Sequence, residues 1–582
     1  MTEQVQGAGG ASSRIGLARV AIGLAQGVAL YGLHWAWIGK PSWPATEPVL
    51  YDGLLLATAF VPLIPLAGLA EMRRATLIVW TVAATVVAAG LGAYGALREA
   101  GGEPHQILSF PVVAFTAAFL FIANHLIAPA DAERKPIASH LAYFDTTWKH
   151  GVQLVLSLLF VGAFWAALRL GGALFGLIGL KFLNELFDKD WFWIPVSFVV
   201  FAAAVHLADV RAGLTRGIRT VGLTLLSWLM PIMGLLAFGF LVALLFTGLA
   251  PLWKLGRSTA ILLSAAAVLV VLINAAYQDG QADTRAPLVL RWAGRITALL
   301  ITPLLMIAAV GLWIRIGQHG LTPDRIIAIA CVIVGACYAL GYGIAAVLPG
   351  AWMKPLERTN VLTALVILVV ILALFTPIAD PARISTDDQV TRLEAGRIAL
   401  DKFDFEFLRF KAGHYGRDAL KRLANRTTGP NAAAIAQRAK DALTEKNRWD
   451  RTHTPLKPVD QIKVYPEGRK LPDSFLKQDW STTPLCEGGF GDCEAYLVDA
   501  NGDSKTEVLL YNGIFANLFA QGADGSWKPA GSYEVFCANV RDALRAGKYA
   551  FVPSVSRDLE IGGVRYAYRN YFGPRACAPP KK

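Results

Sequence analysis

Charged side chains are scarce in this sequence. Asp, Glu, Lys and Arg make up 17% of the 582 residues, whereas 54% are hydrophobic and the mean hydropathy is +0.44. A soluble domain carries about 25% charged residues. This deficit excludes an ordinary soluble protein. Together with long apolar runs, it places the chain in the membrane class, with the lipid bilayer as its surroundings.

A basic patch is also missing. The formal net charge is +12, but the Lys and Arg residues are spread through the gaps between apolar runs. Basic residues in such gaps set the orientation of a membrane protein. We therefore expect no nucleic-acid partner, because nucleic-acid binding requires a basic surface on a folded domain.

Motifs of the well-known enzyme classes are absent. The sequence contains no Walker A loop, no nucleophile elbow, no zinc-protease helix and no nicotinamide-binding fingerprint. No cleavable signal peptide is apparent, because the first apolar run, 17–38, is too long and no small-residue cleavage site follows it. We expect this run to be a retained first span.

Eleven apolar runs are long enough to cross a bilayer, which takes about 20 residues. They cover 17–38, 50–70, 75–97, 107–128, 152–178, 192–210, 221–249, 259–277, 296–316, 326–348 and 361–379. The seventh run contains Pro231 and is long enough to be tilted, kinked or partly re-entrant. The predicted fold class is a membrane all-α polytopic helical bundle of about eleven spans.

Lys and Arg are distributed unevenly between the two sets of loops. If the N-terminus is cytoplasmic, the inner segments carry 15 of these residues and the outer loops carry 8. Short loops rich in Lys and Arg stay in the cytoplasm, so the bias favours this orientation. An odd number of spans then places the residues after 379 outside the cytoplasm. In a Gram-negative cell the protein would lie in the inner membrane with a periplasmic C-terminal domain.

The composition changes after residue 379. Residues 383–450 show helical spacing, 451–482 are Pro-rich, and 486–571 show the period of short strands, with a hairpin signal at Asp524-Gly525. We predict a C-terminal exoplasmic α+β domain. The predicted domains are a cytoplasmic tail (1–16), the membrane bundle (17–379), an exoplasmic helical and linker region (380–482) and a small disulfide-stapled β-rich domain (483–582).

Cysteine is rare, with six residues in the whole chain. Cys331 and Cys337 lie in the tenth span, where we expect buried thiols. An even number in the predicted exoplasmic tail favours disulfides among the others, namely Cys486, Cys493, Cys537 and Cys577. Three pairings are possible, and we favour Cys486–Cys493 with Cys537–Cys577. A four-cysteine zinc site is the alternative, although the tail lacks the short Cys-x-x-Cys pairs of zinc ribbons.

Oxygen-bearing side chains alternate in "VDANGDSKTEVLLY" (498–511). Candidate cation ligands are Asp499, Asn501, Asp503, Glu507 and the backbone carbonyl of Lys505. An EF-hand is excluded, because Ser504 stands where that loop needs glycine and Leu510 stands where it needs glutamate. Two interpretations stay open. One is a structural Ca²⁺ site of millimolar affinity, and the other is a polar turn without metal.

Ionisable residues within the apolar runs are candidates for function, because they are costly in a bilayer. Arg169 lies within the fifth run, and His206 and Asp209 lie near the end of the sixth. Interfacial placement is the alternative for each of them. The loops "FLNELFDKDW" and "SHLAYFDTTWKH" carry the acids and histidines that an enzyme at a membrane face would need, but they read more simply as interfacial loops.

Four stretches taken together resemble a known family. They are "ARVAIGLAQGVALYGLHWA", "TRLEAGRIALDKFDFEFLRFKAGHYGRDALKRLA", "LPDSFLKQDW" and "CEAYLVDANGDSKTEVLLYN". Their order is similar to that of an uncharacterised family of bacterial multi-pass inner-membrane proteins, catalogued as a domain of unknown function of the DUF4153 type. The resemblance implies the same architecture over most of the chain. It brings no activity, substrate or site residue.

Three functional hypotheses follow. The first is transport of a small or lipidic solute, with the tail as an extracytoplasmic accessory domain, and it predicts a polar cavity deep in the bundle. The second is a non-catalytic envelope scaffold or sensor that binds a partner protein through its tail. The third is a membrane-embedded enzyme acting on lipid or glycan carriers, which predicts carboxylates or histidines converging at one membrane face. The sequence points away from an enzyme, because it carries none of the catalytic motifs named above. Calcium is the one cofactor that it suggests.

Overall fold

The chain forms two compact units, Met1–Lys446 and Asn447–Lys582, which we call the helical unit and the C-terminal unit. The computed structural model describes residues 2–99, 108–254, 257–280, 286–445, 462–478, 493–512, 515–534, 540–551, 559–561 and 564–566. The division falls at Lys446 rather than at residue 379. The reason is that the helices directly after the last apolar run pack with the helical unit.

Within the described residues, eleven helical segments are long and apolar enough to cross a bilayer, as the sequence predicts and as in an integral membrane protein. Ten are single helices, and α2 with α3 makes the eleventh. The helices are α1 (Thr2–Trp37), α2 (Pro48–Phe60), α3 (Leu63–Gly68), α4 (Arg74–Glu99), α5 (Phe110–Glu133), α6 (His140–Leu177), α7 (Phe182–Phe187), α8 (Asp190–Val210), α9 (Ala212–Thr247), α10 (Ala250–Lys254), α11 (Ser258–Tyr277), α12 (Leu288–His319), α13 (Pro323–Val347) and α14 (Leu356–Leu374).

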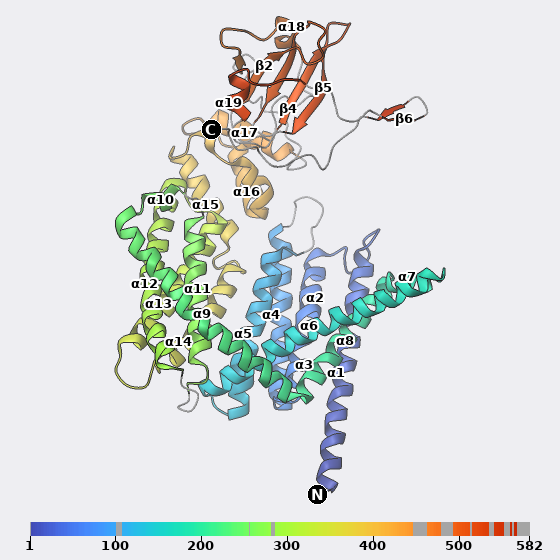
Figure 1. The fold of residues 1–582 in the computed structure, drawn as a ribbon, viewed down its shortest axis with the longest axis vertical. Coiled ribbons are helices and arrows are strands. Elements are labelled where there is room, and N and C mark those ends of the chain that lie inside the picture. The colour runs from blue at the N-terminus through green and yellow to red at the C-terminus, as the bar shows by residue number, and fades with distance from the viewer. Residues whose placement is uncertain are drawn as a thin grey trace. The chain divides into compact units, whose positions relative to one another are not determined.

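Helices α6 and α9, like α1 with its 36 residues and α12 with its 32, are longer than a perpendicular span requires. α6 has 38 residues and α9 has 36, with Pro231 inside α9. At 1.5 Å per residue each is about 55 Å long, against a hydrocarbon core of about 30 Å. Both run obliquely across the bundle (Figure 1). The seventh run, which is long enough to be tilted, kinked or partly re-entrant, forms most of α9, and the fifth run lies in the equally oblique α6.

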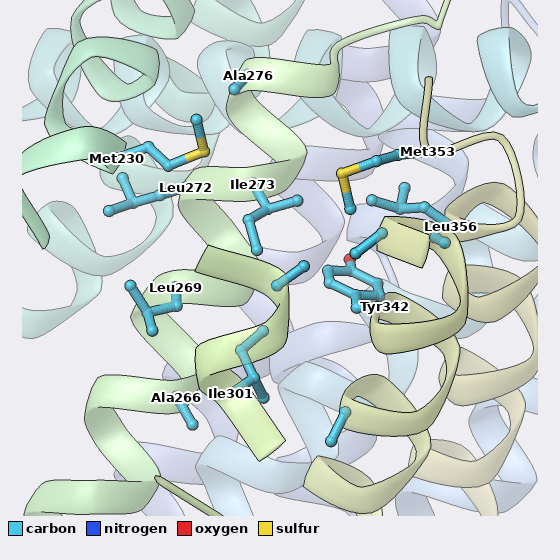
Figure 2. Close-up of a cluster of buried hydrophobic side chains, with 14 of the residues drawn as sticks. Met230, Ala266, Leu269, Leu272, Ile273, Ala276, Ile301, Tyr342, Met353 and Leu356 are labelled. Carbon is cyan, nitrogen blue, oxygen red and sulfur yellow. The ribbon is translucent and has the colours of Figure 1, made fainter. Parts of the chain in front are cut away.

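Two apolar cores hold the helical unit together. One is built from α9, α11, α12 and α13 and includes Leu269, Ile301 and Tyr342 (Figure 2). The other is built mainly from α2, α4 and α5 and includes Ala84 and Ala88. Both α13 and α14 contribute side chains to both cores, so these two helices join the two groups.

Helices α15 (Pro381–Glu394), α16 (Gly413–Ala424) and α17 (Ala432–Thr444) follow the last span. A 3₁₀ turn (Leu400–Lys402) and a π turn (Phe407–Lys411) lie between α15 and α16. Asp380 caps α15 at the amide of Ala382 and accepts a 2.6 Å hydrogen bond from the hydroxyl of Tyr94 in α4. This contact ties the segment after the last span to the C-terminal end of α4.

The C-terminal unit contains a five-stranded sheet in the order β1-β2-β3-β4-β5. The first pair is parallel and the others are antiparallel. The strands are β1 (Lys463–Tyr465), β2 (Glu494–Val498), β3 (Glu507–Tyr511), β4 (Phe515–Gln521) and β5 (Trp527–Glu534), with helices α18 (Asp473–Leu476) and α19 (Val540–Arg545) and a hairpin of β6 (Leu559–Ile561) and β7 (Val564–Tyr566). Phe475, Phe519 and Trp527 belong to one apolar cluster beside the sheet, and Tyr496 and Leu518 belong to another.

The sequence predictions for this unit hold in part. The predicted hairpin at Asp524-Gly525 joins β4 to β5. The strand period that the sequence shows over 486–571 is interrupted at two described places. Val540, the last residue of "YEVFCANV", begins helix α19. Ala550 and Phe551, within "YAFVPSV", lie outside any strand.

Candidate functional site

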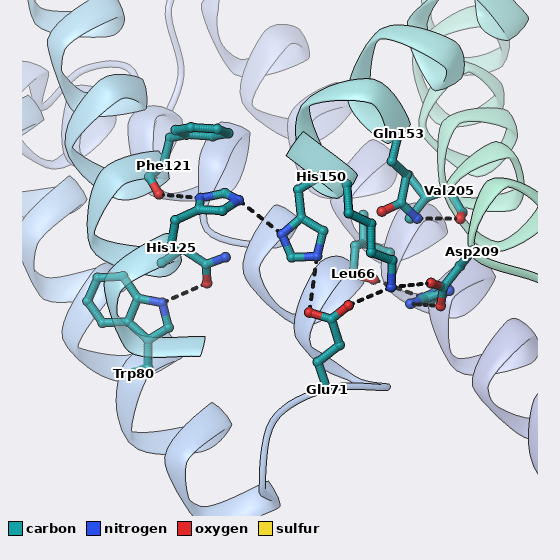
Figure 3. Close-up of polar contacts among 12 residues, drawn as sticks. Leu66, Glu71, Trp80, Phe121, His125, His150, Gln153, Val205 and Asp209 are labelled. Carbon is teal, nitrogen blue, oxygen red and sulfur yellow. Dashed lines mark hydrogen bonds and ion pairs between the residues drawn. The ribbon is translucent and has the colours of Figure 1, made fainter. Parts of the chain in front are cut away.

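Seven ionisable side chains meet at one end of the helical unit, which we call the Arg19 end. They come from α1, the α3–α4 turn, α5, α6 and α8, and Figure 3 shows Glu71, His125, His150 and Asp209 among their contacts. We call them the ion network. Its members are Arg19, Glu71, His125, Lys149, His150, His206 and Asp209.

Two carboxylates link the cations of the network. Asp209 lies 3.0 Å from Nη2 of Arg19 and 2.8 Å from Nζ of Lys149. Glu71 accepts from the same Nζ at 2.6 Å. Arg19 is 1% exposed and also donates to the carbonyl of Leu66 at 2.8 Å. A buried charge is tolerated only when it is paired and hydrogen-bonded, and each of these charges meets that condition.

Two buried histidines extend the chain of contacts. Nδ1 of His125 donates to the carbonyl of Phe121 at 2.6 Å, because a carbonyl can only accept. Nε2 of neutral His125 is then an acceptor, so Nδ1 of His150 donates to it at 3.0 Å. Nε2 of His150 lies 3.2 Å from Glu71. A proton must lie between these last two groups, because an unprotonated imidazole nitrogen and a carboxylate oxygen are both acceptors.

The electrostatics keep Glu71 ionised. Burial raises the pKa of Glu71, but the hydrogen bond and charge of His150 and the charge of Lys149 outweigh it and lower the pKa to about 2. The carboxylate of Glu71 thus faces Lys149 and His150, and Lys149 links it to Asp209 and Arg19 in a continuous run of ion pairs.

A shallow groove lies close to the network, between α4 and α5. Its volume is about 520 Å³, and Thr76, Trp80 and Ile127 are among its lining residues. The indole of Trp80 donates to Oδ1 of Asn124 at 3.1 Å, which fixes the ring against α5. No member of the ion network lines this groove.

A model of the family described as "Domain of unknown function (DUF4153)" matches residues 53–425. The chain belongs to this family. Searches of curated proteins and of solved structures found no match. The matched DUF4153 segment includes the residues of the ion network except Arg19, and it ends before the C-terminal unit begins.

The structure of this DUF4153 protein separates the three intramembrane residues that the sequence singles out. His206 and Asp209 both contact Arg19 within the ion network. Arg169 is not part of it. Its side chain is 50% exposed, pairs with Asp188 at 2.8 Å and lies over the ring of Phe187, near the far end of α6. Arg169 therefore pairs with an acid outside the network.

Sequence reasoning missed most of the network. In the sequence, Arg19 and Lys149 contribute only to the count of charges that set the orientation. Glu71 lies in a short turn between two apolar runs and is not a candidate for function. His150 is noted only as part of an interfacial loop. The available signal was spacing, since Lys149 and His150 lie at the start of a helix that carries both into the same end of the bundle.

The predicted cation loop joins β2 to β3. One carboxylate oxygen each of Asp499, Asp503 and Glu507 lies within 4.8 Å of the others. Asp499 also accepts from the amides of Gly502 and Ser504, at 2.7 and 3.0 Å, as in a polar turn. Ser504 adopts a positive φ of 66°. The carboxylates thus converge, and the turn is also satisfied by hydrogen bonds of its own.

The cysteine predictions fall mostly outside the described residues. Cys331 and Cys337 in α13 are free thiols, and Cys331 is exposed rather than buried in the isolated chain because it lies on the outer surface of the bundle. Cys493 lies just before β2 and packs against one face of the sheet. Cys486, Cys537 and Cys577 lie outside the described residues, so the disulfide pairings stay predictions.

Proposed function

We propose that this protein transports a small or lipidic solute across the inner membrane and that protonation of the ion network is coupled to the transport. The observation that carries the proposal is the Glu71–His150 pair, in which a carboxylate and an imidazole nitrogen lie 3.2 Å apart beside the charge of Lys149. Chains of acids and histidines that face a bundle interior are the usual proton relays of pumps and transporters. Movement between α6, α8 and the α3–α4 turn would break this pair and release the proton.

An enzyme is the alternative that the convergence of histidines and carboxylates also suits. Two observations weigh against an enzyme. The ring nitrogens of His125 and His150 are all engaged within the protein, so neither imidazole faces a substrate as a general base while the network is intact. The groove between α4 and α5 contains no member of the network, so no network residue faces a substrate there.

The proposal is tested with the proton itself as the probe. We expect proteoliposomes on a solid-supported membrane to give a charge-displacement current after a pH jump. Glu71→Gln should lower its amplitude by at least about fivefold, because the paired proton is no longer held. Asp145→Asn is the matched control, since Asp145 pairs with Arg219 at 2.6 Å outside the network. Its current should match that of the wild type.

A second measurement addresses the solute. Vesicles with an imposed proton gradient are incubated with a metabolite and lipid extract, and their contents are identified by mass spectrometry. We expect accumulation with the wild type and none with Glu71→Gln. A wild-type current no larger than that of protein-free vesicles would contradict proton coupling. A current without accumulation of any solute would contradict transport.

We also propose that the β2–β3 loop binds a structural Ca²⁺ on the periplasmic side, as part of an accessory module that contacts an envelope partner. The support is the convergence of the carboxylates of Asp499, Asp503 and Glu507. Calcium takes six to eight oxygens, which leaves room for Asn501, the carbonyl of Lys505 and water. Extracellular calcium modules bind with a Kd of about 10⁻⁴ to 10⁻³ M.

Isothermal titration of the full chain in detergent measures this binding. Asp499→Ala and Asp503→Ala should each abolish the heat of binding at millimolar calcium. Asp524→Ala is the control, because Asp524 occupies the exposed β4–β5 turn and pairs with Lys528. Absence of heat with the wild type would leave the loop as a polar turn without metal.

A further inference from the structure

The groove between α4 and α5 extends along about half of a bilayer's hydrocarbon core. Its lining runs along α4 from Arg73, at the start of the helix, to Ala83. Ten residues of helix extend about 15 Å, which is half of a 30 Å hydrocarbon core and so the depth of one leaflet. The length of the groove therefore matches an acyl chain that enters from the Arg19 end.

The walls of the groove are apolar beyond its mouth. Val79, Trp80, Ala83 and Ile127 line it, and the hydrogen bond from Trp80 to Asn124 holds the indole in place. Ala83 is exposed and small, so its side chain does not block the end of the groove that lies farthest from Arg73. A chain of methylene groups is the ligand that such walls accommodate.

The mouth of the groove is basic. Arg73 pairs with Asp131 through Nε at 2.7 Å and Nη2 at 2.6 Å, yet its side chain is 61% exposed. Among the described residues, its Nη1 has no hydrogen-bond partner and is available to a phosphate. The pair joins the start of α4 to the end of α5, so exposed Arg74 and Arg134 lie at the same end. Counting Lys135 against Asp131 and Glu133 leaves an excess of two positive charges over residues 73–74 and 131–135.

We propose that this groove binds one anionic phospholipid, with an acyl chain between α4 and α5 and the phosphate on Arg73 and Arg74. The site is independent of the proposed transport, because it contains no member of the ion network. Anionic lipid is favoured over zwitterionic lipid, since each Lys or Arg near an anionic headgroup contributes about 1 kcal/mol. A bound lipid would also cover the exposed side chain of Val79.

Native mass spectrometry of the detergent-solubilised full chain tests the proposal, with phosphatidylglycerol and phosphatidylcholine as probes. The wild type should retain one phosphatidylglycerol in preference to phosphatidylcholine. Arg74→Gln should reduce this preference about fivefold, the factor for one lost charge. It is the suitable charge variant, because Arg73→Gln would also leave the buried carboxylate of Asp131 without its cation.

A groove-filling variant separates the groove from the general lipid surface. Ala83→Trp should reduce retained phosphatidylglycerol by at least about fivefold, because the indole occupies the acyl-chain position. Val82→Trp is the matched control, since Val82 is exposed on the same helix but does not line the groove. Equal retention in both variants, equal binding of the two lipids, or a second copy of the chain in place of lipid would each overturn the proposal.

Discussion

At the scale of single residues, one carboxylate in each unit is stabilised in the same way. Asp209 lies between Arg19 and Lys149, and in the C-terminal unit Glu494 lies between Arg541 and Arg545. Each carboxylate thus meets two cations. A buried ion without its partner costs several kcal/mol, so removing any one of these charges leaves an uncompensated group behind.

The stabilisation of Glu494 by its hydrogen-bond partners can be measured through the pH dependence of unfolding. Its side chain is 1% exposed. Burial raises its pKa, but the hydrogen bonds from Arg545, Tyr496 and Arg541 outweigh burial and lower the pKa below the ordinary value of 4.5. A lowered pKa contributes stability that is present above the ordinary pKa and lost as the pH falls through the folded-state pKa. The C-terminal unit should therefore lose stability in acid, below about pH 4.5.

We expect Glu494→Gln to lower the free energy of unfolding of the C-terminal unit at pH 7 by about 1–3 kcal/mol and to flatten its dependence on acid pH. The measurement is urea unfolding of the full chain, followed by fluorine NMR of 5-fluorotryptophan at Trp527, a buried residue of the sheet. Asp542→Asn is the control, because Asp542 is 84% exposed on the same helix as both arginines. Similar losses in the two variants would contradict the role given to burial.

The residue scale also shows where sequence reasoning fails. His206 and Asp209 could be predicted as intramembrane candidates, because charge within an apolar run is visible directly. Arg169 lies within an apolar run, but its place in the sequence does not reveal that its guanidinium reaches Asp188 beyond the end of α6. The role of Glu71 cannot be predicted from the sequence, because only the fold brings this short turn against helices that lie far away in the chain.

At the scale of elements, small residues decide how closely helices approach. A Cβ at Gly23 or Gly27 of α1 would lie 2.5 Å from Phe198 O or from Cα of Pro195 in α8. A Cβ at Gly16 would lie 2.6 Å from Nε2 of His206. Close backbone approach over small residues is the usual source of helix association in a bilayer. This face of α1 also carries Arg19 to Asp209, so packing and the ion network depend on the same interface.

We expect Gly23→Val to lower the thermal unfolding midpoint of the detergent-solubilised protein by several degrees, because the new side chain must push backbone atoms of α8 away. Gly32→Val is the matched control on the same helix, since a Cβ there meets nothing within 4 Å. Its midpoint should stay close to that of the wild type, as read by scanning fluorimetry. Equal shifts would show that the α1–α8 contact does not depend on glycine.

Element boundaries differ from the apolar runs for a physical reason. The fifth run was predicted over 152–178, but α6 begins at His140. Its first three turns carry three polar residues that have partners inside the protein. Asp145 pairs with Arg219. Lys149 pairs with Glu71 and Asp209, and His150 pairs with Glu71. Hydropathy locates the part of a helix that can face a bilayer, and it cannot show helical turns whose polar groups find partners inside the protein.

At the scale of the whole molecule, the helical unit has two distinct ends. The start of α1 lies at the Arg19 end, whereas α15 and α16 contact the opposite end of α4, through Tyr94 and through the carbonyl of Glu99. The odd number of candidate spans produces this arrangement. The eleven candidate spans could be predicted from hydropathy alone, but the docking of 380–445 could not, because amphipathic spacing does not reveal what a helix packs against.

Sidedness is the whole-molecule prediction on which the periplasmic assignment, the disulfides and the calcium site all depend. Lys and Arg number 15 in one set of loops and 8 in the other, which favours a cytoplasmic Arg19 end. We expect alkaline phosphatase fused after Lys582 to be active and the same reporter fused after Gly350, in the α13–α14 turn, to be inactive. A green fluorescent protein at the two positions should give the opposite result. If both reporters were reversed, the C-terminal unit would face a reducing compartment with little free calcium, where neither disulfides nor a millimolar cation site would form.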